Sequence, residues 1–131
     1  MSRSILLAAV LAASALVLGG CGDNDVFRTD RPILRLTLDE YRVVPQSIVV
    51  VGPKRMKFDV RNGGRLTHNL AIQLPDGPDG KPVELTRTAT MQPGERAEPI
   101  KMQLRAGEYR LVCTIANHDD LGQYGTLRVQ G

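Results

Sequence analysis

The sequence has few of the residues that mark common catalytic and nucleic-acid-binding sites. Its 131 residues include two Cys, two His, three Tyr, two Phe and no Trp. So few aromatic side chains argue against a surface on which nucleic-acid bases stack. Two cysteines cannot form the dense disulfide framework of a small secreted domain. A glycine-rich phosphate loop is missing, and any Ser-His-Asp arrangement would have to use the two histidines. We therefore expect neither a nucleic-acid-binding protein nor an enzyme.

Charge of one sign is not concentrated anywhere along the chain. The chain has 17 Lys and Arg and 14 Asp and Glu, which gives a net charge of +3. The longest basic run is Lys54-Arg55, which is too short for a polybasic segment. A length of 131 residues with 42% hydrophobic and 24% charged residues is typical of one globular domain.

The longest apolar run lies at the N-terminus. Residues 5–18 carry no charge and follow Arg3, which is the pattern of an export signal. The run is shorter than the roughly 20 residues that span a bilayer. It ends in Leu18-Gly-Gly-Cys21, which resembles the lipobox of bacterial lipoproteins, in which the chain is cut before the Cys and a lipid is attached to its thiol. We expect residues 1–20 to be a signal peptide and Cys21 to be lipidated.

The protein would then be exported and anchored to a bacterial membrane, on its periplasmic or outer cell-surface face. The alternative is an ordinary secretory signal with a chance Cys.

The rest of the chain has the two-residue periodicity of strands. Residues 21–31 are mostly polar and predict a flexible tether, and residues 32–131 predict the domain. Apolar residues alternate with polar ones over residues 34–38, 56–60, 66–74 and 109–115. Only residues 83–92 leave room for a helical turn. Six to eight short strands separated by turn signals predict an all-β Greek-key antiparallel β-sandwich.

Both histidines and the second cysteine fall in two short stretches that suit a metal. His68 begins a predicted strand, and Cys113-x4-His118-x4-Gln123 follows some 45 residues later. A thiolate, two imidazoles and an amide oxygen form the donor set of a trigonal copper site with a weak axial ligand. We expect His68, Cys113 and His118 to be equatorial ligands of one copper ion and Gln123 to be its axial ligand. Taken singly, the Cys would be interpreted as a core residue and each His as a surface residue. Their joint placement favours the metal.

With these residues the chain from about 41 to 129 resembles the cupredoxins, which are small type 1 blue copper proteins. The resemblance implies a β-sandwich that transfers single electrons. It also implies that Asn69 and Thr114 support the thiolate from a second layer. Asn62 would be either a turn former or a side chain that ties a loop. Further motifs that carry the likeness are Val44-Pro45, Pro93-Gly94-Glu95 and Gly107-Glu-Tyr109.

Two departures from the cupredoxin pattern concern the ligand loop. Ala116-Asn117 stands where the family usually has Pro-Gly, and we expect Asn117 to tolerate a left-handed backbone there. Gln123 stands where Met is usual, as in the stellacyanins, plant cupredoxins with an axial Gln. Their disulfide cannot form here, because Cys113 would be the one thiol left after lipidation.

The expected function is therefore transfer of single electrons between redox protein partners, by a monomer that meets them transiently. Electrons would leave through His118, near the loop surface. One alternative is a copper-binding module for storage, delivery or sensing, although no Met-rich tract supports delivery. Another is a metal-free β-sandwich used in adhesion or complex assembly.

Overall fold

The computed structural model describes residues 25–131. The signal peptide and the lipidated Cys21 predicted from the sequence lie outside these residues. Within them all regular secondary structure is β-strand, and none of their segments forms a helix long and apolar enough to cross a membrane. The strands are β1 (Val26–Thr29), β2 (Ile33–Asp39), β3 (Arg42–Val44), β4 (Ser47–Val51), β5 (Lys54–Asn62), β6 (Ala71–Leu74), β7 (Val83–Arg87), β8 (Ile100–Leu104), β9 (Gly107–Val112) and β10 (Tyr124–Gln130).

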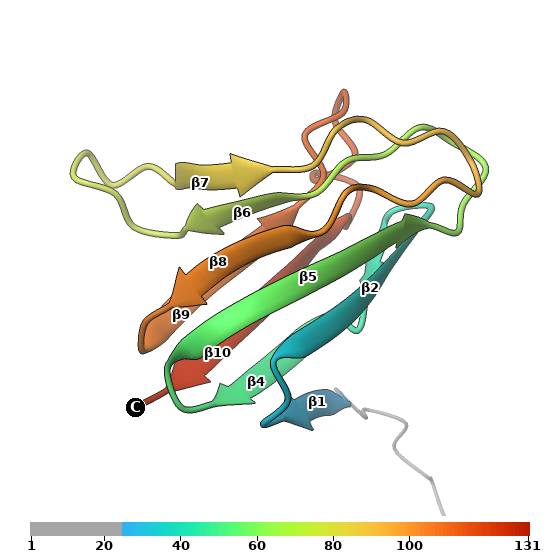
Figure 1. Cartoon of the computed structure of the whole chain (residues 1–131). Helices are drawn as coiled ribbons and strands as arrows, with labels where there is room; N and C mark the ends of the chain where they lie inside the picture. Colours follow the sequence, from blue (N-terminus) through green and yellow to red (C-terminus); the bar gives the residue numbers. More distant parts are fainter. Residues whose placement is uncertain (1–24) are drawn as a thin grey trace, which may run out of the picture.

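The strands form two sheets packed face to face, which confirms the predicted β-sandwich. One sheet has the order β1-β4-β10-β9-β6-β7 and the other β3-β2-β5-β8. In Figure 1, β8, β5 and β2 form the front layer, and β9, β10 and β4 lie behind them. The sheets are mixed rather than uniformly antiparallel, because β1–β4, β4–β10 and β2–β5 pair in parallel. The chain crosses repeatedly between the two layers, and the three parallel pairings all join strands that are not consecutive in sequence.

Two local predictions require correction. Residues 21–31 were expected to be a flexible tether, yet β1 lies within that range and pairs in parallel with β4 from Val26↔Ser47 to Thr29↔Val50. Its sequence, VFRT, is rich in β-branched and aromatic residues, which suit a strand that extends an open sheet edge. Residues 83–92 likewise contain no helical turn, since β7 pairs antiparallel with β6.

The core is built by alternation along the strands of both sheets. In β5, Met56, Phe58 and Val60 are buried, whereas the residues between them face outward. Leu111 of β9 and Leu127 of β10 face them from the other sheet as part of the same buried cluster. Each such side chain contributes about 1.5–3 kcal/mol by leaving water. The packed layers therefore form a rigid frame for the loops that emerge at one end.

Candidate metal centre

One loop brings three of the predicted ligands together. Cys113 follows the last residue of β9, and Gln123 immediately precedes β10. The N–H of Cys113 donates to the carbonyl of Gln123 at 3.1 Å, and the N–H of Gln123 donates to the carbonyl of His118 at 3.0 Å. The loop is thus closed by its own backbone, with all three residues at its base.

His68 reaches the same place from a different segment. Its backbone forms an isolated antiparallel bridge with Met91, with hydrogen bonds of 3.1 and 2.8 Å in the two directions. The bridge holds the residue in an extended conformation just before β6. Two segments separated by 45 residues in sequence therefore meet through the tertiary fold.

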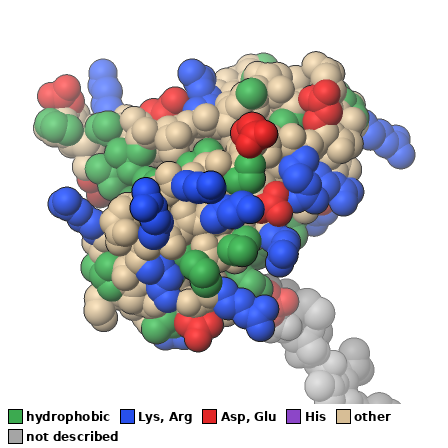
Figure 2. All heavy atoms as spheres, in the orientation of Figure 1, with side chains coloured by type: hydrophobic (Ala, Val, Ile, Leu, Met, Phe, Trp, Pro, Cys, Tyr) green, Lys and Arg blue, Asp and Glu red, His purple; other side chains and the backbone are tan. Residues whose placement is uncertain are grey.

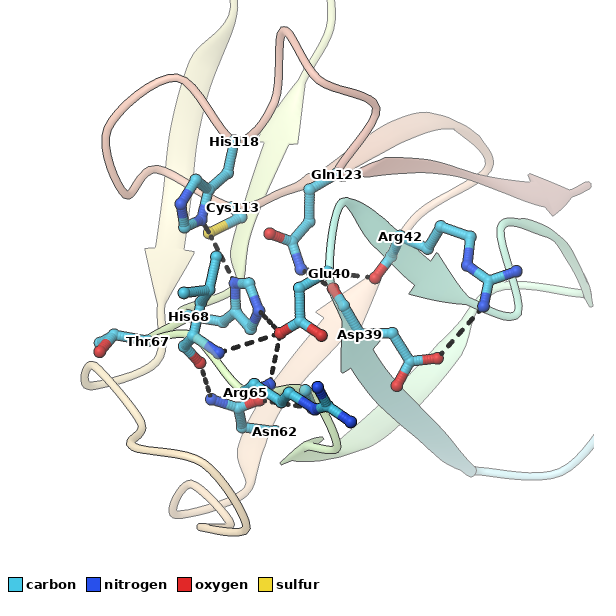
Figure 3. Close-up of polar contacts among 12 residues, drawn as sticks. Asp39, Glu40, Arg42, Asn62, Arg65, Thr67, His68, Cys113, His118 and Gln123 are labelled. Carbon is cyan, nitrogen blue, oxygen red and sulfur yellow. Dashed lines mark hydrogen bonds and ion pairs between the residues drawn. The ribbon is translucent and has the colours of Figure 1, made fainter.

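The three donors converge within one small buried volume. Cys113 Sγ lies 3.9 Å from His68 Nδ1 and 3.7 Å from His118 Nδ1. Figure 3 shows the three side chains gathered at one place. Three donors bound to one ion in a plane, at about 2.0–2.3 Å each, would lie roughly 3.7 Å apart. Cys113 and His68 are fully buried, and His118 is 9% exposed. The donor set and its spacing fit a type 1 copper ion.

Gln123 presents a free oxygen to this cluster. Its amide NH2 donates to the carbonyls of Asp39 at 2.6 Å and of Arg42 at 3.4 Å. Two carbonyl acceptors dictate which end of the amide is the nitrogen. Oε1 then points toward Cys113 and His68, buried and without a hydrogen-bond partner among residues 25–131. A buried oxygen left without a donor costs free energy, which a metal ion at this position would offset.

The hairpin between β2 and β3 contacts both histidines, a feature that sequence reasoning missed. Its two turn residues are Glu40 and Tyr41, and Tyr41 has a left-handed backbone with φ 57°. The Tyr41 ring meets the His118 ring edge-on, with centroids 5.4 Å apart. Glu40 Oε1 lies 3.5 Å from His68 Nε2. A Glu-Tyr pair between two strands carries no sequence signal of this role.

Glu40 faces a buried nitrogen that needs an acceptor. His68 Nε2 is fully buried, and the 3.5 Å contact falls short of hydrogen-bond geometry, so within the described part of the chain it has no hydrogen-bond partner. The adjacent carboxylate favours the tautomer with its proton on Nε2. That tautomer leaves the Nδ1 lone pair directed at Cys113 and His118. A carboxylate behind a histidine orients many metal-binding imidazoles in this way.

The electrostatics keep His68 in the form that binds metal. Burial lowers the pKa of His68, while the Glu40 carboxylate opposes that shift. Glu40 accepts hydrogen bonds from the backbone N–H of Leu66, at 2.9 Å, and of Arg65. These backbone donors lower the pKa of Glu40, and His68 acts in the same direction. Near neutral pH the pair is therefore a neutral imidazole beside a carboxylate.

The other predicted residues brace the ligand segments. Asn69 and Thr114 follow His68 and Cys113. The side-chain amide of Asn69 donates to Thr114 Oγ1 at 2.8 Å and accepts from the backbone N–H of Thr114 at 2.8 Å. Asn62 is fully buried and donates to the carbonyls of Leu66 at 2.7 Å and Met91 at 3.0 Å. Asn62 Oδ1 also accepts from the backbone N–H of Gly64 at 2.9 Å, so the side chain both ties the loop and supports the turn that follows it.

The ligand loop turns at a different residue from the one expected. The left-handed backbone falls on Ala116, with φ 47°, and Asn117 is not among the positive-φ residues. The N–H of His118 donates to the carbonyl of Ile115 at 3.1 Å, which closes the turn around Ala116. The short loop requires this conformation even though alanine does not favour it.

Solved structures share this fold at low sequence identity. A dithionite-reduced auracyanin from the photosynthetic bacterium Roseiflexus castenholzii matches with a TM-score of 0.67 and 18% identity, over 79% of this chain and 100% of that chain. Auracyanin A, a blue copper protein from Chloroflexus aurantiacus, matches with a TM-score of 0.58 and 16% identity, over 75% and 99%. A multicopper oxidase from Campylobacter jejuni matches with a TM-score of 0.55 and 16% identity, over 79% of this chain but only 31% of the oxidase. No protein-family model and no curated protein matches the sequence. The structural matches establish that the chain has the cupredoxin fold predicted from its sequence.

Replacing Glu40 with Gln should destabilise the metal-free protein at pH 7. The folded-state pKa of Glu40 lies below its unfolded value, so its carboxylate stabilises the fold above an unfolded pKa of about 4.3. That stabilisation is lost as the pH falls through the folded-state pKa. The urea midpoint of Glu40→Gln should therefore lie below that of the parent at pH 7, and the difference should shrink below pH 4. Glu98→Gln, at an exposed carboxylate, is the control. A difference that persists unchanged in acid would contradict the assigned role of the charge.

Proposed function

We propose that this cupredoxin-fold protein is a blue copper protein, anchored to a membrane after export, that carries single electrons between redox partners. The observation that carries the proposal is the convergence of His68, Cys113 and His118, with sulfur-to-nitrogen distances of 3.7 and 3.9 Å. The unpartnered Gln123 oxygen beside them supplies a fourth donor. When bound, copper would supply a centre that gains and loses one electron.

The surrounding residues suit such a centre because they hold the donors still. The backbone of the 113–123 loop is closed on itself, and the bridge to Met91 holds His68. Donors held by packed strands move little when the charge of the site changes, which keeps the barrier to electron transfer low. We propose His118 as the route by which electrons enter and leave. It is the one ligand with residual exposure, and Leu121 of the same loop is half-exposed.

Burial of the site favours a carrier over the alternatives. A delivery or storage protein must pass its ion to another molecule, whereas His68 and Cys113 are fully enclosed. A copper enzyme needs room for a substrate at the metal. The match along the whole length of the auracyanins, against less than a third of the oxidase, also supports a carrier. We propose that the protein is monomeric and meets its redox partners through small, transient contacts.

The proposed anchor would keep the domain close to the membrane. Cys21 precedes Val26, the first residue of β1, by five residues, which span at most about 18 Å when extended. A lipid on Cys21 would therefore restrict the domain to the layer next to the bilayer. We propose that this layer is the periplasmic or outer cell-surface face of a bacterial membrane.

Copper titration of the mature chain carrying Cys21→Ser, which removes the lipid and the second thiol, is the direct test of the site. Cu(II) should produce an intense visible absorption band from thiolate-to-copper charge transfer, saturating at one equivalent. Cys113→Ala should abolish the band, while Met102→Ala, a non-ligand core variant, should keep it. A parent protein with no such band would refute copper binding of this type. A coloured protein without fast, reversible one-electron electrochemistry would instead favour storage or delivery.

Replacing Gln123 with Met should raise the reduction potential. An amide oxygen is a harder donor than a thioether and stabilises Cu(II) more. Cyclic voltammetry of the copper-loaded parent and variant measures the shift. Gln73→Met removes another amide oxygen that is buried without a partner in the described chain, and it should leave the potential unchanged. An unchanged or lowered potential in Gln123→Met would argue against axial ligation.

Cys21→Ser should release the protein from membranes. In bacterial cells expressing the full chain, the parent should fractionate with membranes and incorporate labelled fatty acid, because its thiol carries the lipid. The Ser variant should be soluble and unlabelled. Cys113→Ser controls for a general effect of losing a thiol and should remain lipidated. A parent that is exported without label would support the ordinary secretory signal instead.

A further inference from the structure

The outer face of the four-stranded sheet gathers positive charge from segments far apart in sequence. We call it the cationic face. Figure 2, which views this face, shows Lys and Arg side chains spread across it with few carboxylates among them. Its charged residues include Arg35, Arg42, Arg55, Lys57, Arg61, Arg96 and Lys101, with Asp39 and Asp59 among them.

Like charges are placed directly opposite one another on this face. Lys57 of β5 pairs across the ladder with Lys101 of β8, and Arg61 forms a bridge with Arg96. Directly opposed like charges destabilise a sheet. Asp59 pairs with both Arg35, at 4.0 Å, and Arg96, so a single carboxylate serves two guanidinium groups. The face therefore keeps an excess of cations at a cost in stability.

A shallow hollow lies where three of the cations meet apolar side chains. It has a volume of about 230 Å³, and Arg55, Lys57 and Lys101 form its charged part. Pro32, Ile33 and Met56 complete its lining, and Ile33 is 42% exposed. Cations around a small apolar floor suit the phosphate and upper acyl region of an anionic lipid.

The position of the hollow argues against a redox partner as the occupant. Lys57 precedes Asn62, which braces the metal end of β5, by five residues, or about 17 Å along a strand. A partner that exchanges electrons needs the other end of the sandwich, where His118 lies. Docking through the hollow leaves that end free.

We propose that the cationic face docks on anionic lipid headgroups and holds the domain flat against a membrane. The proposal rests on and extends the proposed function, because a lipid on Cys21 would keep the domain near a bilayer. A basic surface and a lipid chain together give more stable membrane attachment than one lipid chain alone. Each Lys or Arg near an anionic surface contributes about 1 kcal/mol, so two of them change binding roughly 30-fold.

Vesicle binding tests the proposal without lipid or copper on the protein. The mature chain carrying Cys21→Ser should sediment with vesicles of phosphatidylglycerol and phosphatidylcholine but not with phosphatidylcholine alone. Binding should weaken as salt is raised. Lys57→Gln/Lys101→Gln should bind roughly 30-fold more weakly, since two headgroup contacts are lost. The matched control is Lys81→Gln/Arg128→Gln, which removes two cations from the side of the six-stranded sheet and should bind far more tightly than the Lys57/Lys101 variant.

A second measurement separates lost binding from lost folding. Lys57→Gln/Lys101→Gln should be at least as stable as the parent in urea at low salt, because it removes two facing charges. Its copper titration should match that of the parent, so this proposal can fail while the copper site stands. Three results would overturn the proposal. They are equal binding of the protein to both kinds of vesicle, an equal loss of vesicle binding in both double variants, and binding of the protein only to an acidic protein.

Discussion

The arrangement of the metal end depends on burying three possible metal donors next to an amide oxygen that has no hydrogen-bond partner among the described residues. Two imidazole nitrogens and a thiol sulfur lie within 4.8 Å of each other, and beside them an amide oxygen has no partner in the described chain. Burying such groups costs free energy unless an ion or a hydrogen bond compensates. The surrounding contacts make this arrangement possible. The bridge to Met91 fixes His68, the closed loop fixes Cys113 and His118, and two carbonyls orient Gln123.

The β2–β3 hairpin links the frame of the sandwich to the chemistry of the site. One turn places Glu40 behind His68 and Tyr41 against His118, and the carbonyls of Asp39 and Arg42 at its two ends hold the amide of Gln123. The left-handed backbone of Tyr41 is the local cost of this arrangement. The four residues of this hairpin, 39–42, therefore contact three of the four proposed ligands. The reduction potential and the rigidity of the site should both depend on it.

Local patterns in the sequence predicted strands correctly, whereas features that depend on strand pairing or loop closure were not predicted. Alternating residues such as Met56, Phe58 and Val60 predicted a half-buried strand, because the side-chain period of a strand is two. The same reasoning took residues 21–31 for a tether. A four-residue edge strand such as β1 is stabilised by its neighbour β4 rather than by its own composition. The left-handed turn was expected at Asn117 and occurs at Ala116, because closure of the loop outweighs the local preference.

The sequence could nominate His68, Cys113 and His118, which the structure brings together, because metal-binding side chains are of few types. Gln123 lies beside them as a proposed fourth ligand, at the end of the loop that holds Cys113 and His118. The proposed export signal is likewise a contiguous pattern in the sequence, and it lies outside the residues that the structure describes. The sequence could not nominate Glu40 behind His68 or the cationic face. Each combines residues from segments that meet only when the strands take up their register, as Lys57 does with Lys101. A chain whose longest basic run is two residues thus acquires a strongly basic face, because pairing in the sheet brings together charges that are dispersed along the chain.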